Sequence, residues 1–271
     1  MELKVVHYEV EDAVALVTLD RATRMNAWTG RMHTEYRWVM ADAERDDAVR
    51  AIVVTGAGRA FCAGADTAAL DGHVDRGSYD AGVDHSTLAR PGYGVRPEFD
   101  HAFAFHYGIP KVVIAAINGP AAGVGLVLAC YCDVRFAAAG AKLTTSSGRL
   151  GLPAEYGLSW VLPRLVGIGH AADLLLSSRV VMAEDAERIG LVNRVLPPDD
   201  VLPTALEYAR TIATEVSPSS VRESKRQLYT DLHRDVGSAV VESEALLDRM
   251  ATEPDFREGV RAWQEKRTPR F

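Results

Sequence analysis

Small residues gather in one stretch of the chain, Asn118-Gly-Pro-Ala-Ala-Gly-Val-Gly125, between two apolar runs. The first run, 112–117, is rich in β-branched residues and predicts a buried strand. The second, 126–131, predicts the start of a buried helix. The free N–H groups of that helix, and the positive end of its dipole, would face the glycine corner. Such a corner can bind a phosphate or stabilise an oxyanion, and the spacing alone leaves both open.

A second cluster of small residues follows a predicted strand at Ala51–Thr55 and runs from Gly56 to Asp66. A dinucleotide-binding fingerprint would need a glycine where Phe61 stands, and the cluster at 119–125 also has the wrong glycine spacing. No lysine of a phosphate-binding P-loop follows either cluster. The two corners therefore do not indicate a nucleotide-binding fold.

The elements around these corners predict a mixed α/β fold. Val5–Val10 and Val14–Leu19 alternate as a hairpin would, and the spacing of apolar residues between Trp28 and Ala43 indicates a helix. The segment 71–97 has no clear period and predicts a long loop, whose aspartates (71, 75, 80 and 84) are interpreted as solvated carboxylates and not as a metal site. Further elements are predicted at 99–107 (a short helix), 134–137, 142–145 and 192–196 (strands), and 158–166, 170–175, 183–190, 240–250 and 256–263 (helices), with a helical pattern from 201 onward.

Composition excludes several classes of function. The chain has 271 residues, 48% hydrophobic and 25% charged, an ordinary mix for a globular protein. Its net charge of −7 argues against nucleic acid as the main partner. No apolar run is long enough to span a membrane, and the first residues lack the pattern of a signal peptide. Its three cysteines show no metal-ligand spacing. We therefore expect a cytoplasmic protein without a metal.

Four motifs in the same order give the chain a clear resemblance to a known family, the crotonase superfamily of enoyl-CoA hydratases and isomerases. They are Leu19-Asp-Arg-Ala-Thr-Arg-Met-Asn-Ala, Phe61-Cys-Ala-Gly-Ala-Asp, the 118–125 stretch followed by Cys132-Asp133, and Glu258-Gly-Val-Arg-Ala-Trp-Gln-Glu-Lys-Arg. Each motif is moderate evidence, but their order along nearly the whole chain is strong evidence.

The resemblance implies a spiral of ββα units with a C-terminal helical region, a homotrimer or dimer of trimers, and an acyl-CoA thioester as substrate. It implies a core at 1–200 with the acyl-CoA site, and a helical region at 201–271 for oligomerisation and for covering the pocket. In such enzymes two backbone N–H groups hold the thioester oxygen; by motif position these belong to Ala65 and Val124. The resemblance also places Arg24, Met25, Ala63, Asp66 and Gly123 along the CoA channel. No cofactor is implied beyond coenzyme A as part of the substrate.

The chain departs from the family's hydratases at two positions. The resemblance places their two catalytic glutamates at Val127 and at about Ser147, and neither residue is acidic. Glu155, in the loop Leu152-Pro-Ala-Glu-Tyr-Gly157, stands where the family's dienoyl-CoA isomerases carry an acid. It is the candidate single acid/base, although a lone glutamate in a loop is more commonly a surface residue or a helix cap. An apolar acyl pocket would raise its pKa, which suits that role.

We therefore predict an enoyl-CoA hydratase/isomerase-type enzyme of fatty-acid or related acyl-CoA metabolism, a lyase or an isomerase. It would act through a thioester enolate, with Glu155 moving the proton and Ala65 and Val124 forming the oxyanion hole. Isomerisation is the first expectation and hydration by Glu155 alone the second. An acyl-CoA hydrolase, a C–C lyase, or a non-catalytic CoA-binding or RNA-binding scaffold on the same fold remains open.

Overall fold

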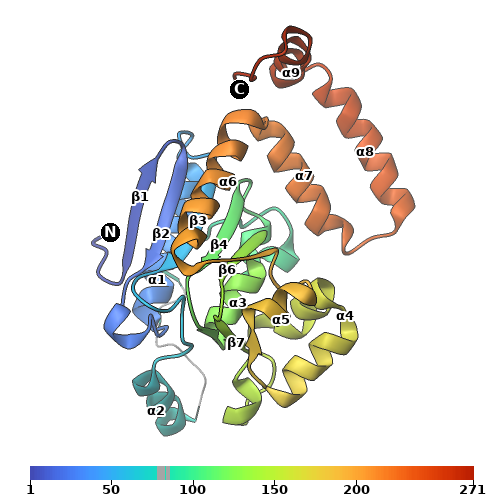
Figure 1. Cartoon of the computed structure of the whole chain (residues 1–271). Coiled ribbons are helices and arrows are strands. Elements are labelled where there is room, and N and C mark those ends of the chain that lie inside the picture. The colour runs from blue at the N-terminus through green and yellow to red at the C-terminus, as the bar shows by residue number, and fades with distance from the viewer. Residues whose placement is uncertain (78–82, 84–85) are drawn as a thin grey trace.

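The computed structural model of the chain describes residues 1–77, 83 and 86–271. Its centre is a six-stranded sheet in the order β1-β2-β3-β4-β6-β9, in which only the β1–β2 pair is antiparallel (Figure 1). A second sheet has the order β5-β7-β8. The strands are β1 (Val6–Glu11), β2 (Val14–Leu19), β3 (Ala51–Gly56), β4 (Val112–Ile117), β5 (Ala121–Ala122), β6 (Val134–Ala138), β7 (Lys142–Thr144), β8 (Val181–Met182) and β9 (Arg194–Leu196).

Helices cover the sheets, and four of them follow one another at the C-terminal end of the chain (Figure 1). The α-helices of the described residues are α1 (Gly30–Arg45), α2 (Thr67–Arg76), α3 (Val124–Tyr131), α4 (Leu158–Ser177), α5 (Ala183–Arg188), α6 (Val201–Glu215), α7 (Pro218–Asp231), α8 (Val236–Met250) and α9 (Pro254–Glu265).

The strands that position the site form where the sequence predicts them. Every residue of β3 and β4 is buried, as expected for parallel strands covered on both faces. The predicted hairpin is confirmed as β1 and β2, with Asp12 and Ala13 in the left-handed region (φ 49° and 62°) that a tight two-residue hairpin turn requires. The mixed α/β prediction is therefore correct at the level of the sheet.

Two predicted segments differ from the structure. Part of the predicted long loop is the helix α2, whose Val74 is 81% exposed; because little of α2 is buried, its sequence carries no apolar period. The short helix expected at 99–107 is replaced by two 3-10 turns, Pro97–Phe99 and Ala104–Tyr107. The two helices predicted at 158–166 and 170–175 are confirmed as the two parts of α4, which are separated by a non-helical backbone at Gly167 (φ 77°, ψ 159°).

The predicted absence of a metal site concerns aspartates in the same segment. Asp71 and Asp75 lie on α2, whereas Asp80 and Asp84 lie outside the described residues. Within 1–77, 83 and 86–271, no group of three or more His, Cys, Asp or Glu side chains could hold a metal ion. None of the helices in these ranges is long and apolar enough to cross a membrane.

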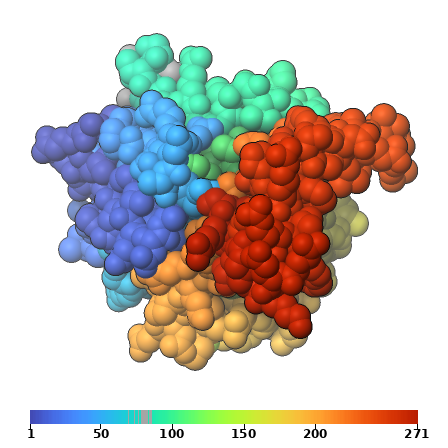
Figure 2. Space-filling view, turned by 90° about the horizontal axis from the view of Figure 1, so that it is seen from above, coloured from blue at the N-terminus to red at the C-terminus, as the bar shows by residue number. Residues whose placement is uncertain are grey.

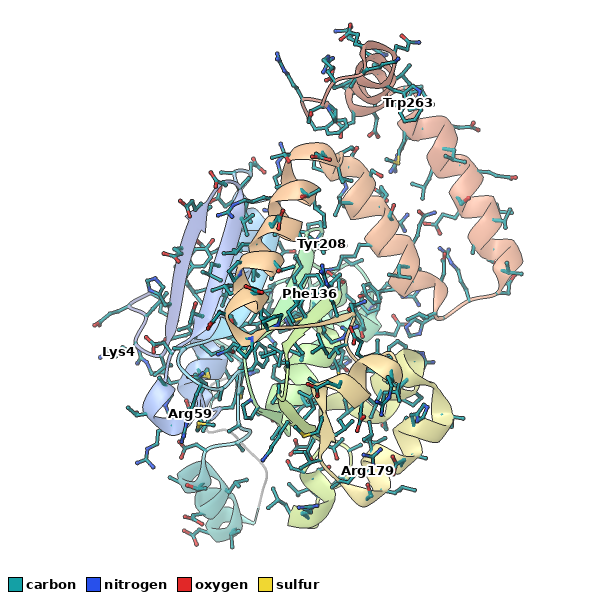
Figure 3. All side chains as sticks on the ribbon, in the orientation of Figure 1. Lys4, Arg59, Phe136, Arg179, Tyr208 and Trp263 are labelled. Carbon is teal, nitrogen blue, oxygen red and sulfur yellow. The ribbon has the colours of Figure 1, made fainter. Side chains whose placement is uncertain are left out.

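The first C-terminal helix belongs to the core, and the last two stand away from it. Tyr208 of α6 packs edge-on against Phe136 of β6, with the ring centroids 5.6 Å apart (Figure 3). Trp263 of α9, in contrast, lies far from the sheet and is 86% exposed (Figure 3). Seen from above, the C-terminal helices lie nearest the viewer, and the orange-red part of them projects past the outline of the body (Figure 2).

A buried ion pair holds α7 to the sheet. The Lys225 ammonium group lies 2.7 Å from Asp133, which directly precedes β6, and it also donates to the Lys111 carbonyl at 2.9 Å. Asp133 further accepts hydrogen bonds from the Val113 N–H and the Tyr229 hydroxyl, each at 2.7 Å. Both charged side chains are nearly buried, so each depends on the other for compensation.

Replacing the cation alone should destabilise the protein strongly. We expect Lys225→Met to lower the free energy of unfolding by about 3–5 kcal/mol, because Asp133 then remains buried without a countercharge. The double variant Lys225→Met/Asp133→Leu should recover part of this loss. Urea denaturation followed by circular dichroism measures both.

The matched control is an exposed pair of the same chemistry, Arg179 and Asp173, in which both side chains are more than 40% exposed. Arg179→Met should leave the denaturation midpoint almost unchanged, since water screens this pair. An equal loss in Lys225→Met and Arg179→Met would show that the buried pair has no special role.

Candidate active site

Two loops at the carboxyl ends of β3 and β4 lie side by side. Cys62 and Ala121 form an isolated parallel bridge, in which the Cys62 N–H donates to the Pro120 carbonyl at 3.2 Å and the Cys62 carbonyl accepts from the Ala122 N–H at 3.0 Å. Ala65 lies three residues after Cys62, and Val124 lies three residues after Ala121. The bridge therefore brings together the two residues that the sequence predicts as oxyanion donors.

Hydrogen bonds to Trp28 fix the loop after β3, so that the N–H of Ala65 points away from Trp28. The Trp28 N–H donates to the Gly64 carbonyl at 2.7 Å, and the Asp66 N–H donates to the Trp28 carbonyl at 2.9 Å. In extended backbone, alternate residues turn their polar groups to opposite sides, so the N–H of Ala65 faces the other way. Among the described residues, no acceptor is bonded to this N–H.

Val124 begins α3, as the sequence predicts. Gly123 precedes it with φ 48° and ψ −122°, a conformation that glycine tolerates and other residues rarely adopt. No side chain caps the helix, and within the described ranges no protein acceptor is bonded to the Val124 N–H. This N–H lies at the positive end of the helix dipole.

Glycine also permits the close contact between α3 and the first loop. A Cβ atom on Gly125 would lie 2.2 Å from the Cys62 carbonyl oxygen, and one on Gly123 would lie 3.9 Å from the Gly64 Cα. The two loops therefore meet backbone to backbone, with no space for side chains between them.

The structure also brings Glu155 to this corner. A Cβ atom on Gly123 would lie 3.7 Å from Oε2 of Glu155 and 3.0 Å from the Ser146 hydroxyl oxygen. The carboxyl group is thus beside the residue that precedes Val124, on a partly buried side chain.

Tyr131, the last residue of α3, fixes the turn that carries Glu155. Its hydroxyl donates to the Tyr156 carbonyl at 2.8 Å, and Tyr156 itself has a left-handed backbone (φ 46°). Burial raises the pKa of Tyr131 to about 12, so this hydroxyl keeps its proton and remains a donor. Sequence reasoning did not find this contact, because the two residues are 25 positions apart and no motif joins them.

The positions of the two hydratase glutamates hold no carboxylate. Val127 lies within α3 and is fully buried, and Ser147 is 4% exposed in a 3-10 turn. Of Val127, Ser147 and Glu155, only Glu155 carries a carboxyl group.

The predicted CoA-channel residues gather near the first loop. The Ala63 N–H donates to the Met25 carbonyl at 3.0 Å, and Arg24, next to Met25, is exposed. Asp66 pairs with Arg21 at 2.9 Å; partial burial opposes its ionisation, but the bond from Arg21 outweighs this and lowers the pKa of Asp66.

Two buried or half-buried asparagines in the motifs hold the loops in place, a role that sequence analysis missed. Asn26 accepts from the Arg21 N–H at 2.9 Å and donates to the carbonyls of Ala57 and Ala60 at 2.9 and 2.8 Å. Asn118 joins β3 to β4 by accepting from the Gly56 N–H and donating to its carbonyl, at 3.2 and 2.8 Å. Both asparagines lie inside the motifs at 19–27 and 118–125, and this position is what could have indicated their structural role.

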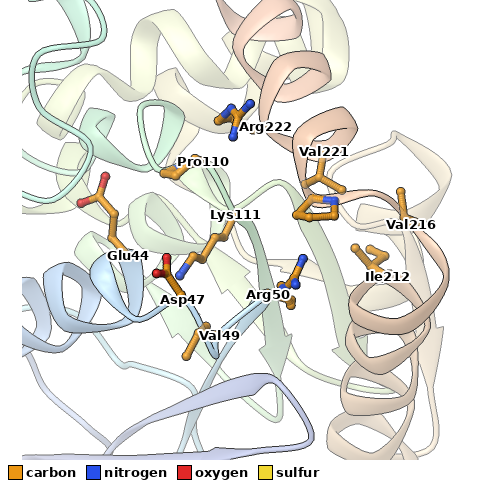
Figure 4. Close-up of a pocket in the computed structure, with 11 residues that line it drawn as sticks. Glu44, Asp47, Val49, Arg50, Pro110, Lys111, Ile212, Val216, Val221 and Arg222 are labelled. Atoms are coloured by element: carbon orange, nitrogen blue, oxygen red, sulfur yellow. The ribbon is translucent and has the colours of Figure 1, made fainter. Parts of the chain in front are cut away.

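Two cavities of the described residues differ in their position relative to the site. The first, of about 620 Å³, is bordered by Tyr131, Tyr156 and Gly157, and therefore by the turn that holds Glu155. The second, of about 360 Å³, lies between the end of α1 and the start of α7, where Lys111 points toward Asp47 (Figure 4). Residues of the site do not line this second cavity.

Comparisons with known proteins agree with this geometry. The family model described as enoyl-CoA hydratase/isomerase matches residues 9–271. The chain is 34% identical to a short-chain-enoyl-CoA hydratase from Clostridium acetobutylicum, over 98% of this chain and 97% of the relative. It is 33% identical to the 1,2-epoxyphenylacetyl-CoA isomerase of Escherichia coli, over 97% of this chain and 96% of the relative.

A solved structure supports the same family. The crystal structure titled as a "probable enoyl-CoA hydratase/isomerase" from Mycobacterium abscessus superposes with a TM-score of 0.86 at 32% identity, covering 98% of both chains. Fold and site thus define an acyl-CoA enzyme with the crotonase fold. The chain belongs to the enoyl-CoA hydratase/isomerase family, and it is an enzyme of the hydratase/isomerase type.

The close contact at Gly125 leads to a stability prediction. Gly125→Ala should lower the free energy of unfolding by about 1–3 kcal/mol or more, because the added methyl group overlaps the Cys62 carbonyl and forces the loops apart. Chemical denaturation measures the change.

Gly169→Ala is the matched control. Gly169 also lies in a helix, α4, but a Cβ atom there would meet nothing within 4 Å. This variant should be neutral or slightly stabilising, since alanine favours helices over glycine. Similar losses in both variants would contradict the proposed close contact.

Proposed function

We propose that the chain is an enoyl-CoA isomerase-type enzyme in which Glu155 moves a proton on a thioester enolate. The observation that carries the proposal is the position of Oε2 of Glu155 beside Gly123, next to the free N–H of Val124. Ala65 and Val124 would donate their N–H groups to the thioester oxygen. Arg24, Met25, Ala63, Asp66 and Gly123 would line the channel for the coenzyme A part of the substrate.

The proposed reaction conserves atoms and electrons. The Glu155 carboxylate takes a proton from the α or γ carbon of an enoyl-CoA, and the electron pair of that C–H bond moves into the conjugated system to give an enolate. The two N–H groups stabilise the negative oxygen, and one such donor is typically worth about 3–4 kcal/mol. Glu155 then returns the proton to the other carbon, and the double bond has moved.

Hydration is the second candidate. It is favoured by the relative from Clostridium acetobutylicum, whose name is that of a hydratase. In this reaction Glu155 alone would take the proton from water and deliver it to the α carbon. A hydrolase, a C–C lyase or a non-catalytic scaffold has less support, and the net charge of −7 disfavours an RNA-binding role.

Exchange in heavy water tests the proton transfer. The protein is incubated in D₂O with 2-enoyl-CoA and 3-enoyl-CoA thioesters, and the products are analysed by mass spectrometry. Isomerisation predicts deuterium uptake or a shifted double bond without a gain of water. Glu155→Gln should reduce the rate by about 10²–10⁴-fold.

Glu207→Gln is the control, because Glu207 is exposed on α6 and does not line the cavity beside Tyr156 and Gly157. It should keep the wild-type rate. A product heavier by one water would favour hydration, and full activity in Glu155→Gln would refute Glu155 as the acid/base.

We further propose that the enzyme assembles through its C-terminal helices, as a homotrimer or a dimer of trimers. In this proposal residues 1–200 carry the site, and residues 201–271 form contacts between subunits and help to cover the pocket. The support is a set of exposed apolar side chains: Val236 (80%), Leu247 (68%) and Trp263 (86%). Such a concentration of exposed apolar surface is unusual for a monomer.

We also propose that the protein is cytoplasmic. The three cysteines are free and buried, which fits the reducing conditions of that compartment.

Light scattering after gel filtration tests the assembly. A trimer predicts about 88 kDa and a dimer of trimers about 176 kDa, for a chain of 29.4 kDa. Trp263→Glu should shift the mass downward, because it places a charge within the apolar surface. The control Leu176→Glu changes an equally exposed residue (86%) on α4. A wild-type mass near 29 kDa would exclude the assembly.

A further inference from the structure

The cavity beside Glu155 has aromatic walls. Its volume is about 620 Å³, within the range of roughly 300–1,000 Å³ that is typical of small-molecule sites. Rings from five separate segments border it, among them Phe99, Tyr107, Tyr131, Trp160 and the imidazole of His233. The rest of the lining consists of Glu98, His101 and Tyr156 and of three residues with small side chains, Ala102, Ala104 and Gly157.

Contacts among these rings hold them in fixed orientations. Trp160 lies parallel to His233, with the centroids 5.3 Å apart, and the Arg164 guanidinium lies 3.8 Å from the Trp160 ring. Tyr107 is stacked on Tyr229 at 3.8 Å. Phe99 meets Tyr107 edge-on at 5.8 Å. Each of these rings thus packs against at least one other ring or a guanidinium group.

The cavity is placed where the end of an acyl group would lie. Tyr156 and Gly157, which line it, directly follow Glu155 in the chain. Tyr131 also lines it and stands seven residues after Val124 on α3, about 10 Å away at 1.5 Å per residue. A substrate held at the Val124 N–H and passing Glu155 would thus extend toward the aromatic walls.

We propose that this cavity receives an aromatic ring, so that the preferred substrates are aryl-substituted acyl-CoA thioesters and not straight-chain ones. The proposal rests on the proposed function in that it places the thioester at Ala65 and Val124. Aromatic pairs gain from edge-to-face or offset contacts in addition to burial, and an alkyl chain gains burial alone. A flat ring also loses less conformational freedom on binding than a six-carbon chain does.

Calorimetric binding of two thioesters tests the preference without requiring turnover. Phenylacetyl-CoA and hexanoyl-CoA share the coenzyme A part and differ in the acyl group, and free coenzyme A gives the baseline. The assembled wild-type protein should bind phenylacetyl-CoA about tenfold more tightly, the effect of one good ring contact. Equal or tighter binding of hexanoyl-CoA would overturn the proposal.

A substitution in the cavity wall tests whether the preference for phenylacetyl-CoA arises in this cavity. Trp160→Leu keeps an apolar residue but removes a ring, and it should abolish most of the preference while hexanoyl-CoA binding changes less than about twofold. Trp38→Leu is the matched control, because Trp38 is a half-buried residue of α1 that does not line this cavity. Loss of the preference in Trp38→Leu, or its retention in Trp160→Leu, would contradict the assignment.

The variant Glu155→Gln separates this proposal from the proposed function. It should retain the preference for phenylacetyl-CoA and lose turnover. Retained turnover together with an intact preference would refute the acid/base role and leave the aryl pocket standing. Lost turnover with no preference would refute the aryl pocket alone.

Discussion

The site depends on one close contact between backbones, in which the first turn of α3 lies against the loop that follows β3. Only a hydrogen atom at Gly125 fits beside the Cys62 carbonyl. This approach allows Cys62 and Ala121 to pair, and the pairing sets Ala65 and Val124 beside each other. Because backbone bonds and not flexible side chains fix both N–H groups, they need little rearrangement to receive a developing oxyanion, which is what makes such donors effective.

The helix α3 then links the two halves of the site. Its first residue supplies the Val124 N–H, and its last, Tyr131, holds the carbonyl of Tyr156 and thereby the turn that carries Glu155. All eight residues of α3 are buried, so the helix cannot shift without disturbing the core. The position of the turn that carries Glu155 relative to the Val124 N–H is therefore tied to a buried helix, which would favour the proposed proton transfer.

The sequence predicts the parts of this arrangement that depend on local chemistry. The buried runs of β3 and β4 and the start of α3 follow from apolar patterning and glycine spacing, which are properties of neighbouring residues. The bond from Tyr131 to Tyr156 could not be predicted, because it depends on how α3 and a loop pack in three dimensions. The helix α2 was missed for the opposite reason: little of it is buried, so no apolar period marks it. The partners of Asn26 and Asn118 likewise become apparent only when the loops are seen together.

Under the proposed function, the residues that replace the two hydratase glutamates bear on the reaction. Hydration requires a group that holds and deprotonates water and a group that delivers a proton to carbon. Val127 can do neither, and Ser147 offers only a hydroxyl, which is a weak acid and a weak base near neutral pH. Glu155 would have to orient the water and transfer its proton unaided. In an isomerisation the same carboxyl group takes and returns one proton, so it ends each cycle in its starting state and needs no water. One well-placed carboxyl group and two fixed N–H groups are sufficient for that reaction, which is why we place isomerisation first.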